Sequence, residues 1–177
     1  MQKYLIKLLL APVLAAALLT ACKPSYNWRD YSSQDAPFRV MFPDKPSTHT
    51  RDIDLDGMSV KMTMTAVDVD GTMFAVGSAQ APDAEKAQAA LGAMKTALVR
   101  NIGATITKEK SSATASNNTR TASIDIEASG VSNGAPMKLL GHFESRDTRF
   151  YQVIVMGKEK AISSEQAEQF LSSFKLQ

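Results

Sequence analysis

The chain has one cysteine, two histidines and one tryptophan among its 177 residues. A single cysteine excludes an internal disulfide framework and any zinc or iron–sulfur site built from several cysteines. The 20 Lys+Arg and 18 Asp+Glu residues leave a net charge of only +2. That balance argues against a dedicated nucleic-acid-binding protein, which would carry a strong basic excess. A glycine-rich phosphate loop, a His-Glu-x-x-His zinc motif and a Gly-x-Ser-x-Gly elbow are all absent, so no motif indicates an enzyme or a cofactor.

The N-terminus is built like a bacterial signal peptide. Lys3 and Lys7, with no acidic neighbour, form a positive region, and an apolar stretch follows from Leu8 to Leu19. This stretch is shorter than the roughly 20 residues that a transmembrane helix needs. It ends in Leu19-Thr20-Ala21-Cys22, which resembles the lipobox of bacterial lipoproteins.

The lipobox predicts the chemistry of Cys22. Its thiolate accepts a diacylglyceryl group, the small Ala21 lets a signal peptidase cleave between Ala21 and Cys22, and the freed amine accepts a further acyl chain such as palmitate. Two or three chains, at about 0.8 kcal/mol per buried methylene, hold a protein stably on a bilayer. We therefore expect residues 1–21 to be a signal peptide and the membrane to be a partner through Cys22. Removal of Lys3 and Lys7 with that peptide would change 20 against 18 charges to 18 against 18, a net charge of zero.

Two other fates of the N-terminus remain open. An ordinary signal peptidase could cleave after Ala15-Ala16-Ala17, which fits its small-residue rule, or the segment could stay as an uncleaved anchor. The lipoprotein interpretation places the protein in the bacterial cell envelope, facing the periplasm. Lys23 follows the cysteine, where an aspartate resembles an inner-membrane retention signal, so the outer membrane is favoured.

Residues 22–37 are predicted to be the lipidated N-terminus and a tether, because residues 23–37 are polar and turn-rich. Three aromatic residues interrupt this segment: Tyr26, Trp28 and Tyr31. Their amphipathic rings could touch the lipid interface or fold back onto the domain. A single domain is predicted over residues 38–177.

Two blocks of strands and two helices account for residues 38–177. Alternating apolar residues predict strands over 38–42, 53–55, 58–67 and 72–79, and again over 104–110, 121–128, 137–145 and 150–156. A helix is predicted after Asp83, and a second after Ser163, where Gln166 would complete a capping box. The small, polar residues 111–118 are expected to form a loop. This order predicts an α+β fold with a mostly antiparallel β-sheet and flanking helices.

Two segments carry a resemblance to a known family. The opening Phe38-Arg39-Val40-Met41-Phe42-Pro43-Asp44-Lys45-Pro46 and the closing Phe170-Leu171-Ser172-Ser173-Phe174-Lys175-Leu176 resemble small bacterial PsbP-like proteins, DcrB-type lipoproteins among them. The resemblance implies an antiparallel sheet with flanking helices and an accessory or binding role. It supplies no catalytic motif, so no functional residue is transferred.

Three groups of residues are candidates for a site. Asp52 to Gly57 imitates half of an EF-hand loop, but its twelfth position is Thr63 instead of glutamate, which favours a hairpin turn. Met62 and Met64 are candidate copper(I) ligands, although methionine more often fills a core. His49 and His142 have no neighbour in sequence that suggests a triad or a zinc pair.

The sequence leaves three classes of function. We expect a non-enzymatic, lipid-anchored envelope protein that binds another envelope protein or supports envelope assembly, with no cofactor and no nucleic acid. The alternatives are a periplasmic module that binds a small ligand or copper, and a hydrolase with an unrecognised site.

Overall fold

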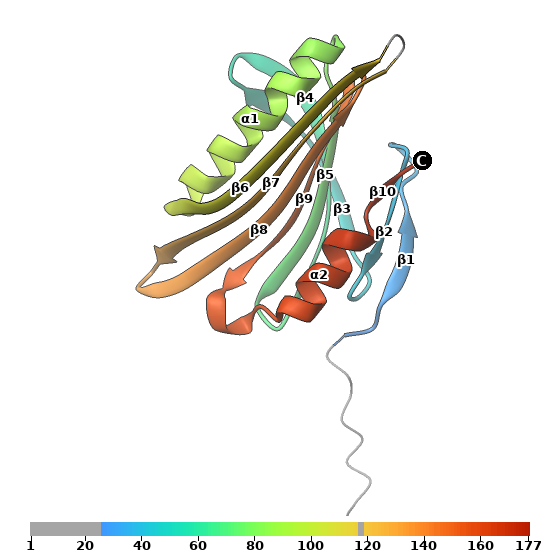
Figure 1. Ribbon diagram of the computed structural model, residues 1–177. Coiled ribbons are helices and arrows are strands. Elements are labelled where there is room, and N and C mark those ends of the chain that lie inside the picture. Colours follow the sequence, from blue (N-terminus) through green and yellow to red (C-terminus); the bar gives the residue numbers. More distant parts are fainter. Residues whose placement is uncertain (1–25, 117–118) are drawn as a thin grey trace, which may run out of the picture.

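The computed structural model describes residues 26–116 and 119–177 and shows an α+β fold of two antiparallel sheets and two helices (Figure 1). The predicted signal peptide, the lipobox from Leu19 to Ala21 and Cys22 lie outside the described residues. In chain order the elements are β1 (Arg29–Ser32), β2 (Phe38–Phe42), β3 (Ser47–Leu55), β4 (Met58–Val69), β5 (Thr72–Gln80), α1 (Ala84–Asn101), β6 (Ala104–Ser116), β7 (Thr119–Ser132), β8 (Ala135–Arg146), β9 (Arg149–Lys158), the short 3-10 helix η2 (Glu159–Ala161), α2 (Ser164–Ser173) and β10 (Lys175–Leu176). The predicted order of strands, helix, strands, helix is confirmed.

The large sheet has seven strands in the order β3-β4-β5-β9-β8-β7-β6, and the small sheet has three in the order β1-β2-β10. All pairs are antiparallel, and most are hairpins between neighbours in sequence. The β3–β4 hairpin turns at Asp56 and Gly57, both with positive φ (54° and 84°), as the two-residue turn predicted. Asp70 and Gly71 form a turn with the same positive φ angles (52° and 79°) at the other end of β4. Because the 12 residues of β4 separate these two acidic turns, their carboxylates cannot bind one calcium ion together.

Helix α1 covers one face of the large sheet. The Asp83 carboxylate accepts a hydrogen bond from the backbone N–H of Lys86 (2.8 Å), which caps the first turn, and Gly103 (φ 59°) follows the last. The buried stripe of the helix contacts strands β6 to β9 and forms one core cluster with them. Its fully buried members include Ala87, Leu91, Leu139, Phe143 and Ile154.

Helix α2 and the small sheet cover part of the opposite face. Phe38 and Phe42 of β2 and Phe170 of α2 pack onto Phe74 and Tyr151 of the large sheet. All of these rings are at most 1% exposed. The large sheet is therefore the middle of three layers, with α1 on one side and α2 with the small sheet on the other (Figure 1).

Two sequence predictions are corrected by the structure. Residues 111–116 were expected in a loop, but they continue β6 and pair with β7 as far as Ser116 opposite Thr119. The expected tether is shorter than residues 23–37, because residues 29–32 form β1 on the edge of the small sheet. The aromatic side chains pack on the domain, as one of the two alternatives predicted: Tyr26, Trp28 and Tyr31 lie against the second core cluster.

Within the described residues, no helix is both long enough and apolar enough to span a membrane.

Candidate functional site

Strands β6, β7 and β8 are left without a covering layer on the face opposite α1. Helix α2 has only ten residues and contacts β9 and the near side of β8, so the outer strands remain open beside it. The result is a groove of about 710 Å³ between α2 and the outer strands. Its charged and apolar lining includes Lys108, Lys110, Asp125, Glu127, Lys138, Leu140, His142, Glu168 and Leu171.

A bulge in β6 turns two lysines into this groove. Ile106 pairs with Ala128 and Lys108 pairs with Glu127, so Thr107 is the extra residue. Ile106 therefore packs on the α1 side, whereas Lys108 lines the groove. Thr107 stabilises the bulge by donating a side-chain hydrogen bond to the carbonyl oxygen of Glu127 (3.1 Å).

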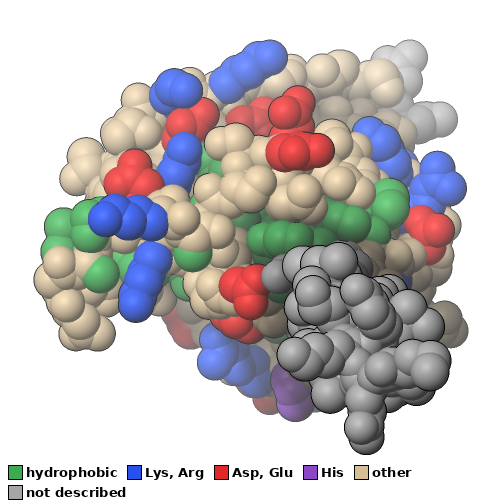
Figure 2. Space-filling view, turned by 90° about the horizontal axis from the view of Figure 1, so that it is seen from below, with side chains coloured by type: hydrophobic (Ala, Val, Ile, Leu, Met, Phe, Trp, Pro, Cys, Tyr) green, Lys and Arg blue, Asp and Glu red, His purple; other side chains and the backbone are tan. Residues whose placement is uncertain are grey.

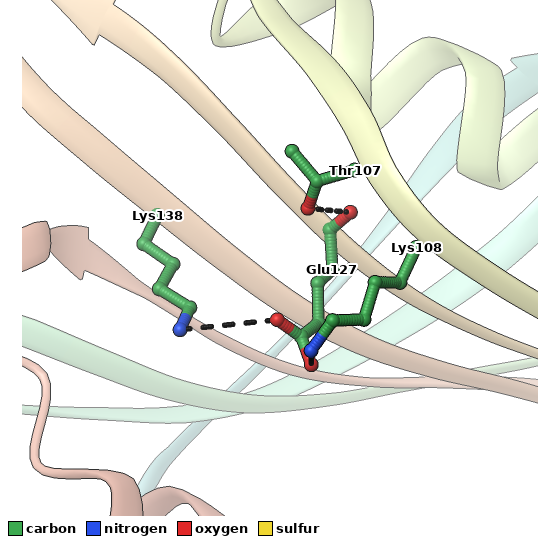
Figure 3. Close-up of polar contacts among 4 residues, drawn as sticks. All are labelled: Thr107, Lys108, Glu127 and Lys138. Atoms are coloured by element: carbon green, nitrogen blue, oxygen red, sulfur yellow. Dashed lines mark hydrogen bonds and ion pairs between the residues drawn. The ribbon is translucent and has the colours of Figure 1, made fainter.

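Glu127 lies between two lysines from neighbouring strands, as Figure 3 shows. The Lys108 Nζ is 2.9 Å from one carboxylate oxygen of Glu127, and the Lys138 Nζ is 3.9 Å from the other. The Lys108 side chain is 73% exposed, so this pair adds little to stability, about 1 kcal/mol or less. The three side chains place charges of both signs along the groove.

His142 lies between two carboxylates in the same groove. Its Nδ1 is 2.7 Å from Asp125 Oδ1 on β7, and its Nε2 is 3.3 Å from Glu144 Oε2 on β8. Burial lowers the pKa of His142, but the hydrogen bonds and negative charges of Glu144 and Asp125 outweigh burial, so its pKa is raised above the usual value. The protonated ring donates to both partners, whereas a neutral ring can donate to only one.

The geometry around His142 does not suit a metal ion or a general base. The two carboxylates contact opposite nitrogens of the ring, so they do not converge with it on one ion. Among residues 26–116 and 119–177, no group of three His, Cys, Asp or Glu side chains is placed to hold a metal. Both ring nitrogens are already engaged, which leaves neither free to accept a proton from a serine.

A smaller pocket of about 360 Å³ adjoins the groove on the C-terminal side of α2. His142, Leu171 and Ser172 line both pockets. The His142 ring also lies 6.1 Å from the ring of Phe174, measured between centroids. His142 therefore links the groove to the end of α2.

The candidate copper ligands lie on the other side of the large sheet. Met62 is 3% exposed within the α1 core cluster. Met64 is partly buried against the same cluster, and its sulfur accepts a hydrogen bond from Gln152 Nε2 (3.4 Å). The sulfur also fills the space above Gly77, where a Cβ would lie 2.7 Å from it. Copper binding would require both side chains to leave this packing. His49, opposite Met64 on the edge strand β3, is exposed.

Only some of the groove residues could be predicted from the sequence. The predicted strand over 137–145 is confirmed as part of β8, and its alternation places His142 on one face with Lys138, Leu140 and Glu144. The contact with Asp125 depends on the register of β7 against β8, and the position of Lys108 depends on the bulge. Neither feature has a local sequence signal.

Neither protein-family models nor curated proteins give a match to this chain.

Proposed function

We propose that this chain is a non-enzymatic, lipid-anchored protein of the bacterial cell envelope that binds a segment of another envelope protein in the groove beside α2. The proposal depends mainly on the groove itself, which is lined by charges of both signs and by apolar side chains. A protein segment with mixed charges and apolar side chains matches such a lining better than an ion of one sign.

Two further observations support the anchored, accessory role. Leu19-Thr20-Ala21-Cys22 has the residue types of a lipobox, which supports acylation of Cys22 and attachment to the envelope, with Lys23 favouring the outer membrane. The resemblance of Phe38–Pro46 and Phe170–Leu176 to PsbP-like proteins, DcrB-type lipoproteins among them, supports a binding role.

Site-specific photo-crosslinking in intact cells tests this function. A photoreactive amino acid at position 110, on the groove wall, is expected to give a discrete adduct with one envelope protein. The same amino acid at position 50, on the exposed edge strand β3, serves as the control and is expected to give no such adduct.

A charge reversal makes the test specific to the groove. Glu127→Lys places a third positive charge between Lys108 and Lys138 and should reduce the adduct about tenfold, which corresponds to about 1.4 kcal/mol of binding. Asp52→Lys makes the same charge change on the far strand β3 and should leave the adduct unchanged. Equal adducts from positions 110 and 50, or an adduct insensitive to Glu127→Lys, would contradict the proposed binding site.

A small ligand is the second candidate, because a volume of about 710 Å³ lies within the roughly 300–1,000 Å³ of typical small-molecule sites. Native mass spectrometry of protein isolated from the envelope would then show an added mass that is lost in Glu127→Lys. Unliganded protein together with a groove-dependent adduct would favour the protein partner.

A further inference from the structure

The first described residues, 26–28, pack against the domain and form hydrogen bonds with it. The rings of Tyr26 and Trp28 stack 6.2 Å apart, and both pack edge-on against Phe74, at 6.3 and 6.4 Å. Trp28 Nε1 donates a hydrogen bond to Gln166 Oε1 at the start of α2 (3.0 Å), and the Asn27 backbone N–H donates to the carbonyl of Pro43 (2.7 Å). Residues 26–28 therefore belong to the domain, which was predicted to start at residue 38.

This start leaves very little chain for a tether. Only Lys23, Pro24 and Ser25 separate Cys22 from Tyr26. At about 3.5 Å per residue, the Cα atoms of Cys22 and Tyr26 can be at most about 14 Å apart. A tether reaching residue 37 would have allowed roughly 50 Å by the same measure.

The elements around Tyr26 form one end of the molecule, at the bottom of Figure 1. The β4–β5 turn lies there, because Tyr26 packs on Phe74 near the start of β5. Burial raises the pKa of the Tyr26 hydroxyl, and the charge of Asp70 in this turn raises it further. Helix η2 lies there too, since Thr72 donates a hydrogen bond to the carbonyl of Ala161 (3.2 Å). We call the β4–β5 turn, η2, the first turn of α2 and the Tyr26–Trp28 pair the anchor end.

We infer that the anchor end rests on the phospholipid headgroups of the bilayer that holds the acylated Cys22. This inference depends on the lipid anchor of the proposed function. Tyr26 and Trp28 are half-buried amphipathic rings, the residue type favoured at the headgroup level. Acidic and basic side chains are interspersed with hydrophobic surface on this face, as Figure 2 shows from below. The charged side chains of the anchor end nearly balance, with Asp70, Glu159 and Glu165 against Lys160 and the adjacent Lys158. The contact is therefore imposed by the short tether and should depend little on salt.

The orientation places the groove next to the membrane. Lys138 of β8 pairs with Gly157 of β9, and Gly157 pairs with Thr72 of β5. Lys138, which lines the groove, is therefore level with the anchor end of the sheet. Ser164, at the start of α2, also lines the groove. A partner would therefore be bound at the bilayer surface.

Headgroup quenching in vesicles tests this orientation. The lipidated chain is reconstituted in phosphatidylethanolamine–phosphatidylcholine vesicles containing a lipid with a nitroxide on its headgroup. Cys22 is the only cysteine and its thiol is consumed by lipid, so one introduced cysteine can carry a fluorophore. Lys160→Cys labels the anchor end, and Thr114→Cys is the matched exposed control. Through successive strand pairs, Thr114 lies in the same row of the sheet as Gln80 of β5. Gln80 is eight residues along β5 from Thr72 at the anchor end, so the two rows are about 26 Å apart.

We expect the probe at position 160 to be quenched several-fold more than the probe at 114, equally at low and high salt. The single tryptophan, Trp28, should be quenched as well. Insertion of about 20 Gly/Ser residues between Ser25 and Tyr26, with a typical span of about 25 Å, should reduce quenching at position 160.

The outcomes separate this inference from the proposed function. A protein that floats with the vesicles but shows equal quenching at 160 and 114, or quenching at 160 that the insertion does not change, contradicts the orientation alone. A protein that does not float with the vesicles contradicts the anchor and the orientation together.

Discussion

His142 is the residue whose chemistry the groove changes most. Asp125 and Glu144 face its two nitrogens, and the side chain is only 24% exposed. Other charged groups lie near it: Lys138 on its own strand, Lys110 opposite Asp125 on β6, Arg146 on β8 and Lys175 after α2. The carboxylates stand closest, so a positive ring is favoured.

Asp125→Asn should lower the pKa of His142, because it replaces the carboxylate that contacts Nδ1 with a neutral amide. A proton NMR titration measures this shift, and the chain has only two histidines to distinguish. Asp54→Asn, which changes a carboxylate near the end of β3, is the control. An unchanged pKa in Asp125→Asn would show that the contact does not exist in solution.

The raised pKa also makes stability depend on pH. His142 binds its proton more tightly in the folded chain than in the unfolded chain, where its pKa is about 6.5. Its stabilising effect is therefore complete below about pH 6.5 and is lost as the pH rises through the raised folded pKa. Urea unfolding should show that His142→Gln costs about 1 kcal/mol at pH 5.5 and less at pH 8.5. A cost that grows with pH would contradict this assignment.

Met62 and Met64 differ in burial, and substitutions should reveal that difference. Met62→Ala is expected to reduce the free energy of unfolding by about 2–5 kcal/mol, because it opens a cavity in the α1 core cluster. Met64→Ala should cost less, because Met64 is only partly buried. The Met62→Leu, Met64→Leu double variant keeps the volume and should leave copper affinity unchanged. Copper binding that disappears in this variant would restore the copper alternative.

Strand β1 stabilises the domain although it has only four residues. It pairs with β2 from Arg29 opposite Phe42 to Ser32 opposite Arg39, and Tyr31 packs on Phe38 and Phe42. A chain that begins at Ser33 should lose at least about 3 kcal/mol of unfolding free energy relative to one that begins at Tyr26, because it lacks this pairing and three packed aromatic rings. Urea denaturation of both chains measures the difference. Equal unfolding free energies would show that residues 26–32 do not stabilise the domain and belong to the tether.

Elements with an internal hydrophobic pattern were predictable from sequence, and those held by distant partners were not. Helix α1 begins after Asp83 as predicted, and Ser163 caps α2 as expected by accepting a hydrogen bond from the Gln166 backbone N–H (3.5 Å). The side chain of Gln166 instead accepts from Trp28, which the capping-box prediction did not include. The outer part of β6 has exposed residues on both faces, so it lacks the alternation that marks a half-buried strand.

At the scale of the whole molecule, the three layers explain where a site can form. The small sheet and α2 cover the inner strands of the large sheet, and α1 packs on the other face, whereas the α2 side of β6–β8 remains open as the groove. The order of elements predicted an antiparallel sheet with flanking helices, but it did not predict the separate three-stranded sheet or the three layers. It could not predict the open groove, because that depends on how far a ten-residue helix reaches across a seven-stranded sheet.

We propose that the domain works while attached to a bilayer through Cys22. Mass spectrometry of the N-terminal peptide of the protein isolated from membranes tests it most directly, because the three possible fates of the N-terminus give three different peptides. We predict a peptide that begins at Cys22 and carries the mass of a diacylglyceryl group and an added acyl chain. A lipid-free peptide beginning at Leu18, or one that retains residues 1–21, would contradict the claim.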